Sequence, residues 1–124
     1  MILGIGLDLV AVARIRDAHG RHGTRFLDRF LTAAEQAYCL DHRDPAERIA
    51  GRWAAKEAAV KALGTGISDG IGLLQVEILP GPGGAPVLVF HAAAGERATA
   101  RGVTRTLVTI THSDGMAAAM VVLE

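Results

Sequence analysis

The order of the elements in the sequence predicts an α+β fold, with a long central helix packed on a mainly antiparallel sheet. An apolar strand opens the chain, an alanine-rich helix occupies its middle, and turns rich in glycine and proline separate short apolar runs in its second half. Such turns join strands as antiparallel hairpins, whereas a doubly wound sheet requires strands and helices to alternate. At 124 residues we expect one domain, residues 1–124, because this length builds one core but not two.

The amino-terminal segment predicts a strand and then a short helix. Residues 2–8 are apolar apart from Asp8, and this acidic residue and the absence of a basic start argue against a signal sequence. A helix is expected from residue 11 to about residue 18. It should end near Gly20, because Gly20 and Gly23 disfavour a longer helix.

The middle of the chain carries two helix start signals. Thr32 and Glu35 form a capping box for a helix through about Leu40, since their side chains can satisfy free backbone N–H groups. Asp44 and Pro45 then supply a cap and a first helical residue. The helix that they open should cover residues 45–63 and end at the glycines of Gly64-Thr-Gly66.

The second half predicts two strand pairs and one helix. Residues 74–79 and 87–90 should form a hairpin around a turn of glycine and proline, followed by a helix over 92–101. Residues 106–111 and 116–123 should form a second pair, because the Asp-Gly dipeptide between them favours a tight turn.

The composition excludes several classes of protein. Half of the residues are hydrophobic, which argues against disorder, and the formal net charge of zero argues against general affinity for nucleic acid or membranes. No stretch approaches the roughly 20 apolar residues that span a bilayer. The single cysteine, Cys39, allows no internal disulfide and fits the reducing cytoplasm, where we expect the protein.

Asp8 is the first candidate functional residue. A carboxylate inside an apolar strand is unfavourable by several kcal/mol unless a cation or hydrogen-bond donors compensate it. Asp8 could instead cap the helix expected from residue 11, and the sequence leaves these readings about even. Gly4 and Gly6 nearby lack the third glycine of a dinucleotide-binding loop, so they indicate close packing of the backbone.

Glu57 and Lys61 are the second candidates. The chain has only two lysines, Lys56 and Lys61, and they flank Glu57 on the central helix. Glu57 and Lys61 share a helix face, and on spacing alone a surface ion pair is favoured over a functional role. The alanines around them, however, would let a ligand approach closely, and Asp8 with Glu57 would suit Mg²⁺, with Mn²⁺ as the second candidate ion.

A basic segment and a histidine complete the candidates. Five arginines and two aspartates lie between residues 14 and 29, a local surplus of three positive charges. The segment could be an ordinary solvated helix face, but interleaved side chains such as Phe26 would suit an acidic protein partner; no recognised nucleic-acid module accompanies it. His112 is either a structural histidine or an anion-binding donor.

Three motifs at characteristic separations resemble one family. These are Gly4-Ile-Gly-Leu-Asp8, Ala50-Gly-Arg-Trp-Ala-Ala-Lys-Glu-Ala58 followed by Lys61, and Val108-Thr-Ile-Thr-His-Ser113. Together they resemble the holo-acyl carrier protein synthases, the small bacterial members of the 4′-phosphopantetheinyl transferase superfamily, over almost the whole chain. Trp53 departs from the family, in which phenylalanine is common at this position.

The resemblance implies both a fold and a reaction. The enzyme would have the 4′-phosphopantetheinyl transferase fold and would move the phosphopantetheine arm of coenzyme A onto a serine of apo-acyl carrier protein for fatty acid biosynthesis, releasing adenosine 3′,5′-bisphosphate. Asp8 and Glu57 would hold Mg²⁺ and Lys61 would meet the leaving phosphate. Glu57 is the best-placed acceptor for the serine proton, with Asp8 as the other candidate.

The resemblance also implies binding residues and an assembly. Family members of this size form homotrimers with active sites between subunits. The basic segment between residues 14 and 29 would attract the acidic carrier, and we assign this role to Arg14, Arg21, Arg25 and Phe26. Coenzyme A would be bound by Arg52, Lys61, Gly64, Pro86, Thr111, His112 and Ser113.

Two alternatives differ in function class. A transferase of broader specificity would serve polyketide or peptide-synthetase carriers, although such enzymes are usually about twice this length. A non-enzymatic α+β binding module would have Asp8 as a helix cap and Glu57 with Lys61 as a surface pair. It would show no Mg²⁺-dependent turnover.

Overall fold

The computed structural model describes residues 1–68 and 70–124 and has the expected α+β architecture. Strands β1, β5 and β4 form an antiparallel three-stranded sheet with β5 in the centre, and β2 and β3 form a separate antiparallel hairpin. The bounds are β1 Gly4–Ala11, α1 Val12–His22, α2 Thr24–Asp28, α3 Ala33–Leu40, α4 Ala46–Leu63, the 3₁₀ turn η1 Leu73–Gln75, β2 Val76–Pro80, the 3₁₀ turn η2 Pro82–Gly84, β3 Pro86–Phe90, α5 Ala92–Ala100, β4 Thr106–Ser113 and β5 Met116–Leu123.

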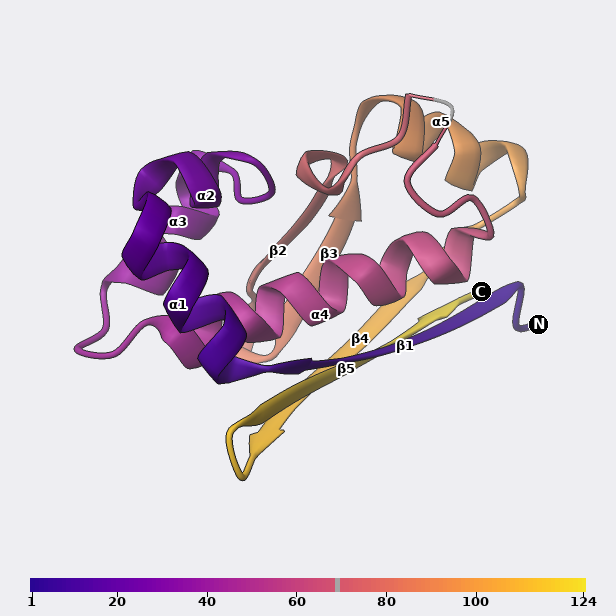
Figure 1. Ribbon diagram of the computed structural model, residues 1–124. Helices are drawn as coiled ribbons and strands as arrows, with labels where there is room; N and C mark the ends of the chain where they lie inside the picture. Colours follow the sequence, from indigo (N-terminus) through magenta and orange to yellow (C-terminus); the bar gives the residue numbers. More distant parts are fainter. Residues whose placement is uncertain (69) are drawn as a thin grey trace.

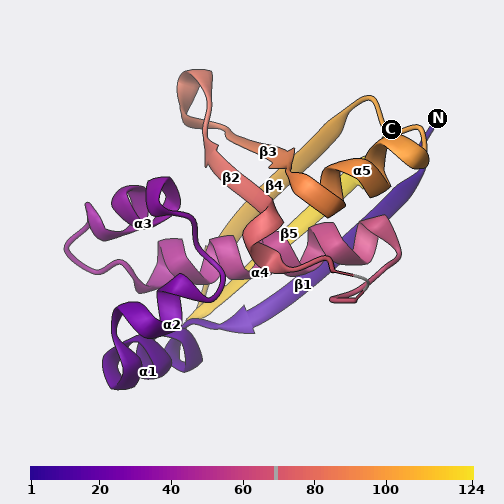
Figure 2. The same ribbon diagram turned by 90° about the horizontal axis from the view of Figure 1, so that it is seen from above.

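Helix α4 is the centre of the molecule. It lies across one face of the three-stranded sheet, while the β2–β3 hairpin and α5 cover its opposite side (Figures 1 and 2). Helices α1, α2 and α3 gather at its amino-terminal end (Figure 1). Two layers therefore bury α4, which explains why its sequence is rich in alanine.

Two glycines of β1 allow the helix to approach the sheet. A Cβ atom at Gly6 would lie 1.8 Å from the carbonyl oxygen of Ala58, and one at Gly4 would lie 2.1 Å from that of Ala62. Such distances are impossible, so no larger residue fits without moving the backbone. The prediction that these glycines mark close packing is confirmed.

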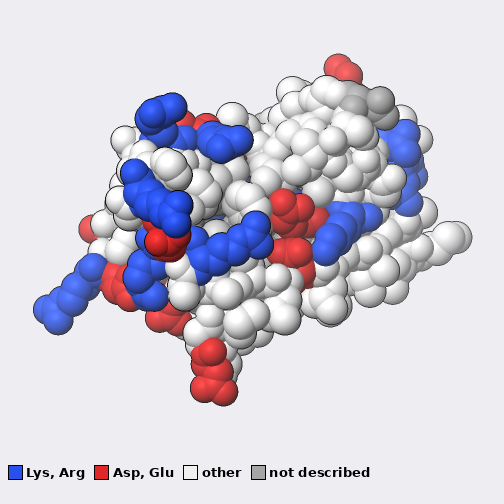
Figure 3. All heavy atoms as spheres, viewed as in Figure 1, with Lys and Arg blue, Asp and Glu red and all other residues white. Residues whose placement is uncertain are grey.

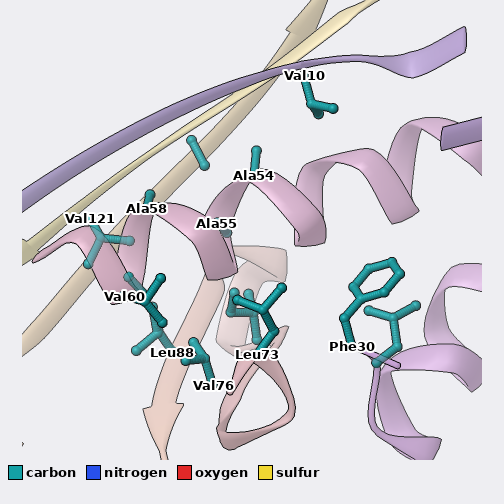
Figure 4. Packing of buried hydrophobic residues seen from close by; sticks show 14 of the residues in the cluster. Val10, Phe30, Ala54, Ala55, Ala58, Val60, Leu73, Val76, Leu88 and Val121 are labelled. Atoms are coloured by element: carbon teal, nitrogen blue, oxygen red, sulfur yellow. The ribbon is translucent and has the colours of Figure 1, made fainter. Parts of the chain in front are cut away.

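The core fills both sides of α4 with aliphatic side chains. Ala54 and Ala58 face β1 and β5, whereas Val60 faces the side that carries Leu73 and Leu88 (Figure 4). Small residues of α4 therefore face the sheet, which the helix approaches closely, and larger residues face the hairpin. Among the described residues, no helix has the length and apolarity needed to cross a membrane.

Local signals in the sequence located several boundaries correctly. Thr32 and Glu35 form the capping box, and helix α4 ends at Gly64 in the left-handed conformation, with φ of 79°. The Asp114-Gly115 turn joins β4 to β5, and both residues have positive φ. Each signal depends on contacts within a few residues, which a sequence displays directly.

Other boundaries differ from the prediction. Helix α1 continues through Gly20 and ends at His22, just before Gly23, because an exposed helical glycine is unfavourable by only about 1 kcal/mol relative to alanine. Helix α2 was not predicted. Strand β1 runs to Ala11, and the run expected as a strand from residue 74 begins as the turn η1.

A fully buried ion pair joins four elements and was also missed. The Lys56 ammonium on α4 lies 2.6 Å from the Glu35 carboxylate on α3, and both side chains have no exposed surface. Lys56 also donates to the carbonyl oxygen of Leu73, and Glu35 accepts from the backbone N–H of Ile78 in β2. Burial lowers the pKa of Lys56, and the negative charge of Glu35 opposes this effect.

Candidate active site

Asp8 and Lys61 meet where β1 crosses α4. Alternate residues of a strand point to the same face, so Asp8 follows Gly4 and Gly6 onto the face that contacts α4. The Lys61 ammonium lies 3.1 Å from an Asp8 carboxylate oxygen and donates to the carbonyl oxygen of Leu7 at 3.0 Å. The Asp8 side chain is 16% exposed and that of Lys61 is 52% exposed. The pair therefore remains open to solvent on the lysine side.

Glu57 lies on the same face of α4, one turn before Lys61. Burial raises the pKa of the Glu57 carboxyl above its usual value, and the negative charge of Asp8 raises it further. The positive charges of Lys61 and Arg14 oppose this shift. Two carboxylates and a lysine thus form one electrostatically coupled group, with an arginine of α1 nearby.

The geometry decides two alternatives that the sequence left open. Asp8 lies inside β1, and the residue that precedes α1 is Ala11, which makes no side-chain capping bond. Asp8 is therefore not a helix cap. Lys61 forms its ion pair with Asp8, and no pair with Glu57 is present among residues 1–68 and 70–124, so the surface pair that spacing alone favoured is not formed.

The carboxylates of Asp8 and Glu57 fit a hard divalent cation. Within the described part of the chain, no group of three or more His, Cys, Asp or Glu side chains could hold a metal ion. Mg²⁺ does not need such a group, because it commonly binds one or two carboxylates together with waters and substrate phosphates. The repulsion between Asp8 and Glu57 would also be relieved by a cation.

A second group of candidate residues lies around the amino-terminal half of α4. Arg52, Pro86 and His112 line a hollow of about 210 Å³ between α3, α4, β4 and the tip of the β2–β3 hairpin. The His112 ring nitrogen Nδ1 lies 2.7 Å from the carboxylate of Glu47. Arg52 is 7% exposed, and its Nε atom is buried without a hydrogen-bond partner. This hollow has the character of an anion site.

The two groups face different directions. Arg52 and Glu57 are five residues apart, so they project about 140° apart around α4. Gly64 ends α4 beyond Lys61, away from the hollow that contains Arg52. The chain therefore does not bring all the residues expected to bind coenzyme A together.

The Thr111-His112-Ser113 motif is divided between the faces of the sheet. Through the pairing of β4 with β5, His112 lies opposite the buried Ala117 and faces α4. Thr111 and Ser113 are exposed and belong to the outer face.

The predicted carrier-binding residues lie at the α1–α2 end of the molecule. Lysine and arginine side chains gather over this end, and acidic and basic side chains adjoin near the middle of the same face (Figure 3). Arg14 is exposed on α1, and Arg21 forms an exposed ion pair with Asp17 at 3.2 Å. Arg25 and Phe26 line one hollow of about 480 Å³.

Phe26 has a further contact that the sequence did not reveal. Its ring stacks on Trp53 with centroids 6.3 Å apart, and Phe30 packs edge-on against both rings. This aromatic cluster attaches α2 to α4 one helical turn before Glu57. The basic surface is thereby attached to the helix that carries Glu57 and Lys61.

Comparison with known proteins identifies the family. Residues 4–119 match the model of the 4′-phosphopantetheinyl transferase superfamily. Over 124 residues the chain is 49% identical to the holo-[acyl-carrier-protein] synthase of Nitratidesulfovibrio vulgaris, covering 100% of this chain and 99% of that protein. The synthase of Koribacter versatilis is 44% identical over 124 residues, with 100% and 99% coverage.

Solved structures agree with this result. The Helicobacter pylori holo-[acyl-carrier-protein] synthase in complex with coenzyme A has a TM-score of 0.85 and 34% identity, covering 97% of this chain and 99% of that one. The Neisseria meningitidis synthase has a TM-score of 0.91 and 31% identity, with 100% and 99% coverage. The fold, the matched motifs and the full-length relatives agree, and the chain belongs to the 4′-phosphopantetheinyl transferase superfamily.

Proposed function

We propose that the chain transfers the 4′-phosphopantetheine group of coenzyme A to a serine hydroxyl of apo-acyl carrier protein, in fatty acid biosynthesis. The observation that carries this proposal is full-length similarity to holo-[acyl-carrier-protein] synthases, one of which was solved with coenzyme A. The grouping of Asp8, Glu57 and Lys61 at the crossing of β1 and α4 supports it, because transfer of a phosphoryl-type group requires neutralised phosphate charge.

The reaction exchanges a phosphoanhydride bond of coenzyme A for a phosphoester bond to serine. The serine oxygen bonds to the phosphorus that carries the pantetheine arm, and the bond from that phosphorus to the bridging oxygen breaks. Adenosine 3′,5′-bisphosphate leaves with that oxygen. The serine proton passes to a carboxylate, for which Glu57 is the first candidate, because a raised pKa makes it a stronger base, and Asp8 is the second.

Lys61 and the two carboxylates would have different electrostatic roles. Asp8 and Glu57 would hold Mg²⁺, or Mn²⁺ as the second candidate, which supplies positive charge to the pyrophosphate. The Lys61 ammonium, half exposed beside Asp8, would donate to an oxygen of the leaving phosphate. Lys61 and Gly64 would contact the phosphate end of coenzyme A, whereas Arg52, Pro86 and His112 would bind its nucleotide end.

A homotrimer would bring these two groups of residues together. In one chain they project about 140° apart around α4, so one coenzyme would contact Asp8 of one subunit and Arg52 of its neighbour. An apolar surface is available for the assembly on the outer face of the sheet, which α4 does not cover. Its exposed members are Ile5, Leu7, Leu9, Leu107 and Met120. Thr111 and Ser113 lie on the same face and would reach the neighbouring site.

The carrier would bind beside this site. The surplus of arginine at the α1–α2 end would attract an acidic partner, and Arg14 contributes positive charge at Glu57. Arg21, Arg25 and Phe26 would extend the contact. The reaction would take place in the cytoplasm, where a lone cysteine stays reduced; burial also raises the pKa of Cys39 to about 11, which keeps its thiol protonated.

Mass spectrometry tests the reaction. The protein is incubated with apo-acyl carrier protein, coenzyme A and Mg²⁺, and the carrier should gain the mass of one phosphopantetheine group. The same assay with carrier domains of polyketide and peptide synthetases measures specificity, and equal rates would favour the broader transferase. An unmodified acyl carrier protein at all Mg²⁺ concentrations would favour the non-enzymatic binding module.

Light scattering tests the assembly. The wild-type protein should have the mass of three chains, and Leu7→Arg should give inactive monomers because Leu7 is 63% exposed on the outer face. Leu74→Arg is the matched control, since Leu74 is an exposed leucine outside that face. A monomeric wild-type protein with full activity would refute the shared site.

A further inference from the structure

Arg101 lies at the end of α5, where a helix-stop motif fixes its backbone. The N–H of Gly102 donates to the carbonyl oxygen of Thr99 at 2.9 Å. The N–H of Val103 donates to the carbonyl oxygen of Ala98 at 2.9 Å. With Gly102 in the left-handed conformation, at φ of 79°, these bonds form the Schellman motif that ends many helices. Helix α5 lies over the carboxyl-terminal end of α4 (Figure 1), so this motif places Arg101 beside the last turn of α4.

The Arg101 guanidinium joins the end of α4 to the start of β1 through three backbone carbonyls. Its Nη1 atom donates to the carbonyl oxygens of Ala62 at 2.9 Å and Leu63 at 2.8 Å, in the last turn of α4. Its Nη2 atom donates to the carbonyl oxygen of Leu3, the residue before β1. The last four carbonyls of a helix have no partner within it, so Arg101 satisfies two of those of α4.

The charge of Arg101 also suits this place. Among residues 1–68 and 70–124, no carboxylate lies within 4.0 Å of its guanidinium. The carbonyl end of a helix carries a partial negative charge of roughly half an elementary charge, and the end of α4 therefore balances part of the arginine charge. A lysine would supply the charge but not the planar fork that reaches two segments at once.

These hydrogen bonds lie beside the candidate active site. Ala62 follows Lys61 in α4, and Gly4 and Asp8 lie on the face of β1 that contacts α4. The close approach at Gly4 brings the strand to the helix, but an apolar contact has no direction and does not fix where one slides along the other. Among the described residues, the Lys61 side chain makes the only direct hydrogen bonds between β1 and α4. The Arg101 fork is a second directional link, through the residue that enters β1.

We propose that Arg101 is a positioning residue of this site, which fixes the register of β1 on α4 and thereby the contact of Asp8 with Lys61. The inference rests on the proposed function only for its effect on turnover. Helical side chains lean toward the amino terminus of their helix, so Lys61 reaches back along α4 to Asp8, and a slide of the strand would change this reach. The sequence did not indicate Arg101, because its partners lie 38 to 98 residues away.

A double-mutant cycle with Lys61 tests the proposal. Arg101→Met should reduce kcat about tenfold and leave the KM for the carrier close to its wild-type value, since a displacement of about 1 Å can reduce a rate by up to about a hundredfold. In the Lys61→Met background the same change should have little further effect, because residues that act through one contact are not additive. Arg97→Met, which removes an exposed arginine one turn earlier on α5, is the matched control. An equal factor in both backgrounds would show a merely structural role and overturn the inference.

Arg101→Lys decides the result if Arg101→Met does not fold. It keeps the positive charge at the end of α4 and loses the fork. Its kcat should therefore fall in the wild-type background and not in the Lys61→Met background. A wild-type kcat in Arg101→Lys would show that the charge alone suffices, and it would overturn the proposed control of register.

Nuclear magnetic resonance separates this inference from the proposed reaction, because it requires neither carrier nor turnover. The chain has only two lysines, so protein labelled at the lysine ε carbon gives two signals, and Lys61→Met assigns them. Asp8→Asn should shift the Lys61 signal in the otherwise wild-type protein, since the two charged groups lie 3.1 Å apart. In Arg101→Met this response should be largely lost. An unchanged response would overturn the inference even if the carrier is modified normally. If the response depends on Arg101 but no carrier is modified, the reaction fails and the positioning role stands.

Discussion

The two lysines of the chain lie five residues apart on α4 and have opposite surroundings. Lys56 has no exposed side-chain surface and contacts Glu35 at 2.6 Å. Lys61 is half exposed and contacts Asp8 at 3.1 Å. Buried pairs are left strongly unfavourable when one partner is removed, whereas solvent screens exposed pairs. Breaking the first pair should therefore destabilise the fold, whereas the second pair leaves an ammonium free to reach a ligand.

The largest expected effect is the loss of Lys56. Lys56→Met should lower the free energy of unfolding by about 3–5 kcal/mol, because Glu35 would remain buried without its cation. Urea denaturation followed by circular dichroism measures the change. The double variant Lys56→Met with Glu35→Gln should recover part of the loss, since glutamine carries no charge. A loss below about 1 kcal/mol in the single variant would show that the fold does not depend on Lys56.

Loss of Lys61 should reduce turnover strongly and stability only slightly. Lys61→Met should reduce turnover about a hundredfold, the scale of a lost electrostatic stabiliser. Its free energy of unfolding should change by less than about 1 kcal/mol, as for exposed pairs. Carrier modification and urea denaturation of the same preparation measure both values. Normal turnover in Lys61→Met would assign the lysine to structure alone.

A smaller effect is expected at the basic end of the molecule. Reversing the charge of Arg14 and Arg21 should raise the KM for the carrier about tenfold, and added salt should reduce the difference because these charges are exposed. The KM for coenzyme A should stay close to the wild-type value. A collapse of coenzyme A binding instead would assign these arginines to the nucleotide site.

The smallest effect is expected at an ordinary surface pair. Arg16 and Asp44 are both more than half exposed and lie 2.7 Å apart. The hydrogen bond from Arg16 lowers the pKa of Asp44 below its usual value, so any stabilisation exists at neutral pH and is lost as the pH falls through the lowered pKa. Asp44→Asn should leave the denaturation midpoint nearly unchanged at pH 7. A large shift of the midpoint would contradict the expectation that only the buried pair contributes strongly to stability.

Features that depend on neighbouring residues could be predicted from the sequence. The capping box of Thr32, the end of α4 at Gly64 and the Asp114-Gly115 turn are such features. Asp8 was also recognisable, because a charge in an apolar strand is unusual. The error at Gly20 arose because the small penalty of one helical glycine was outweighed by the rest of α1.

Contacts between distant segments could not be predicted. Lys56 and Glu35 are 21 residues apart, and Lys61 and Asp8 are 53 residues apart. Spacing alone favoured a pair between Glu57 and Lys61, because they share a helix face, but the crossing of β1 over α4 supplies a different partner. The stacking of the Arg48 guanidinium on the Tyr38 ring was not predictable for the same reason, since only the packing of α3 brings the ring to α4.

The proposed function requires that Asp8 serves chemistry and not folding, and one variant tests this requirement directly. Asp8→Asn keeps the shape of the side chain and removes its charge. Turnover is measured over a range of Mg²⁺ concentrations. It should fall about a hundredfold or more, and its dependence on the Mg²⁺ concentration should change. Thermal stability in metal-free buffer should be unchanged or higher, because a partly buried charge has been removed. A fully active variant with the wild-type dependence on Mg²⁺ would show that Asp8 is not part of the site.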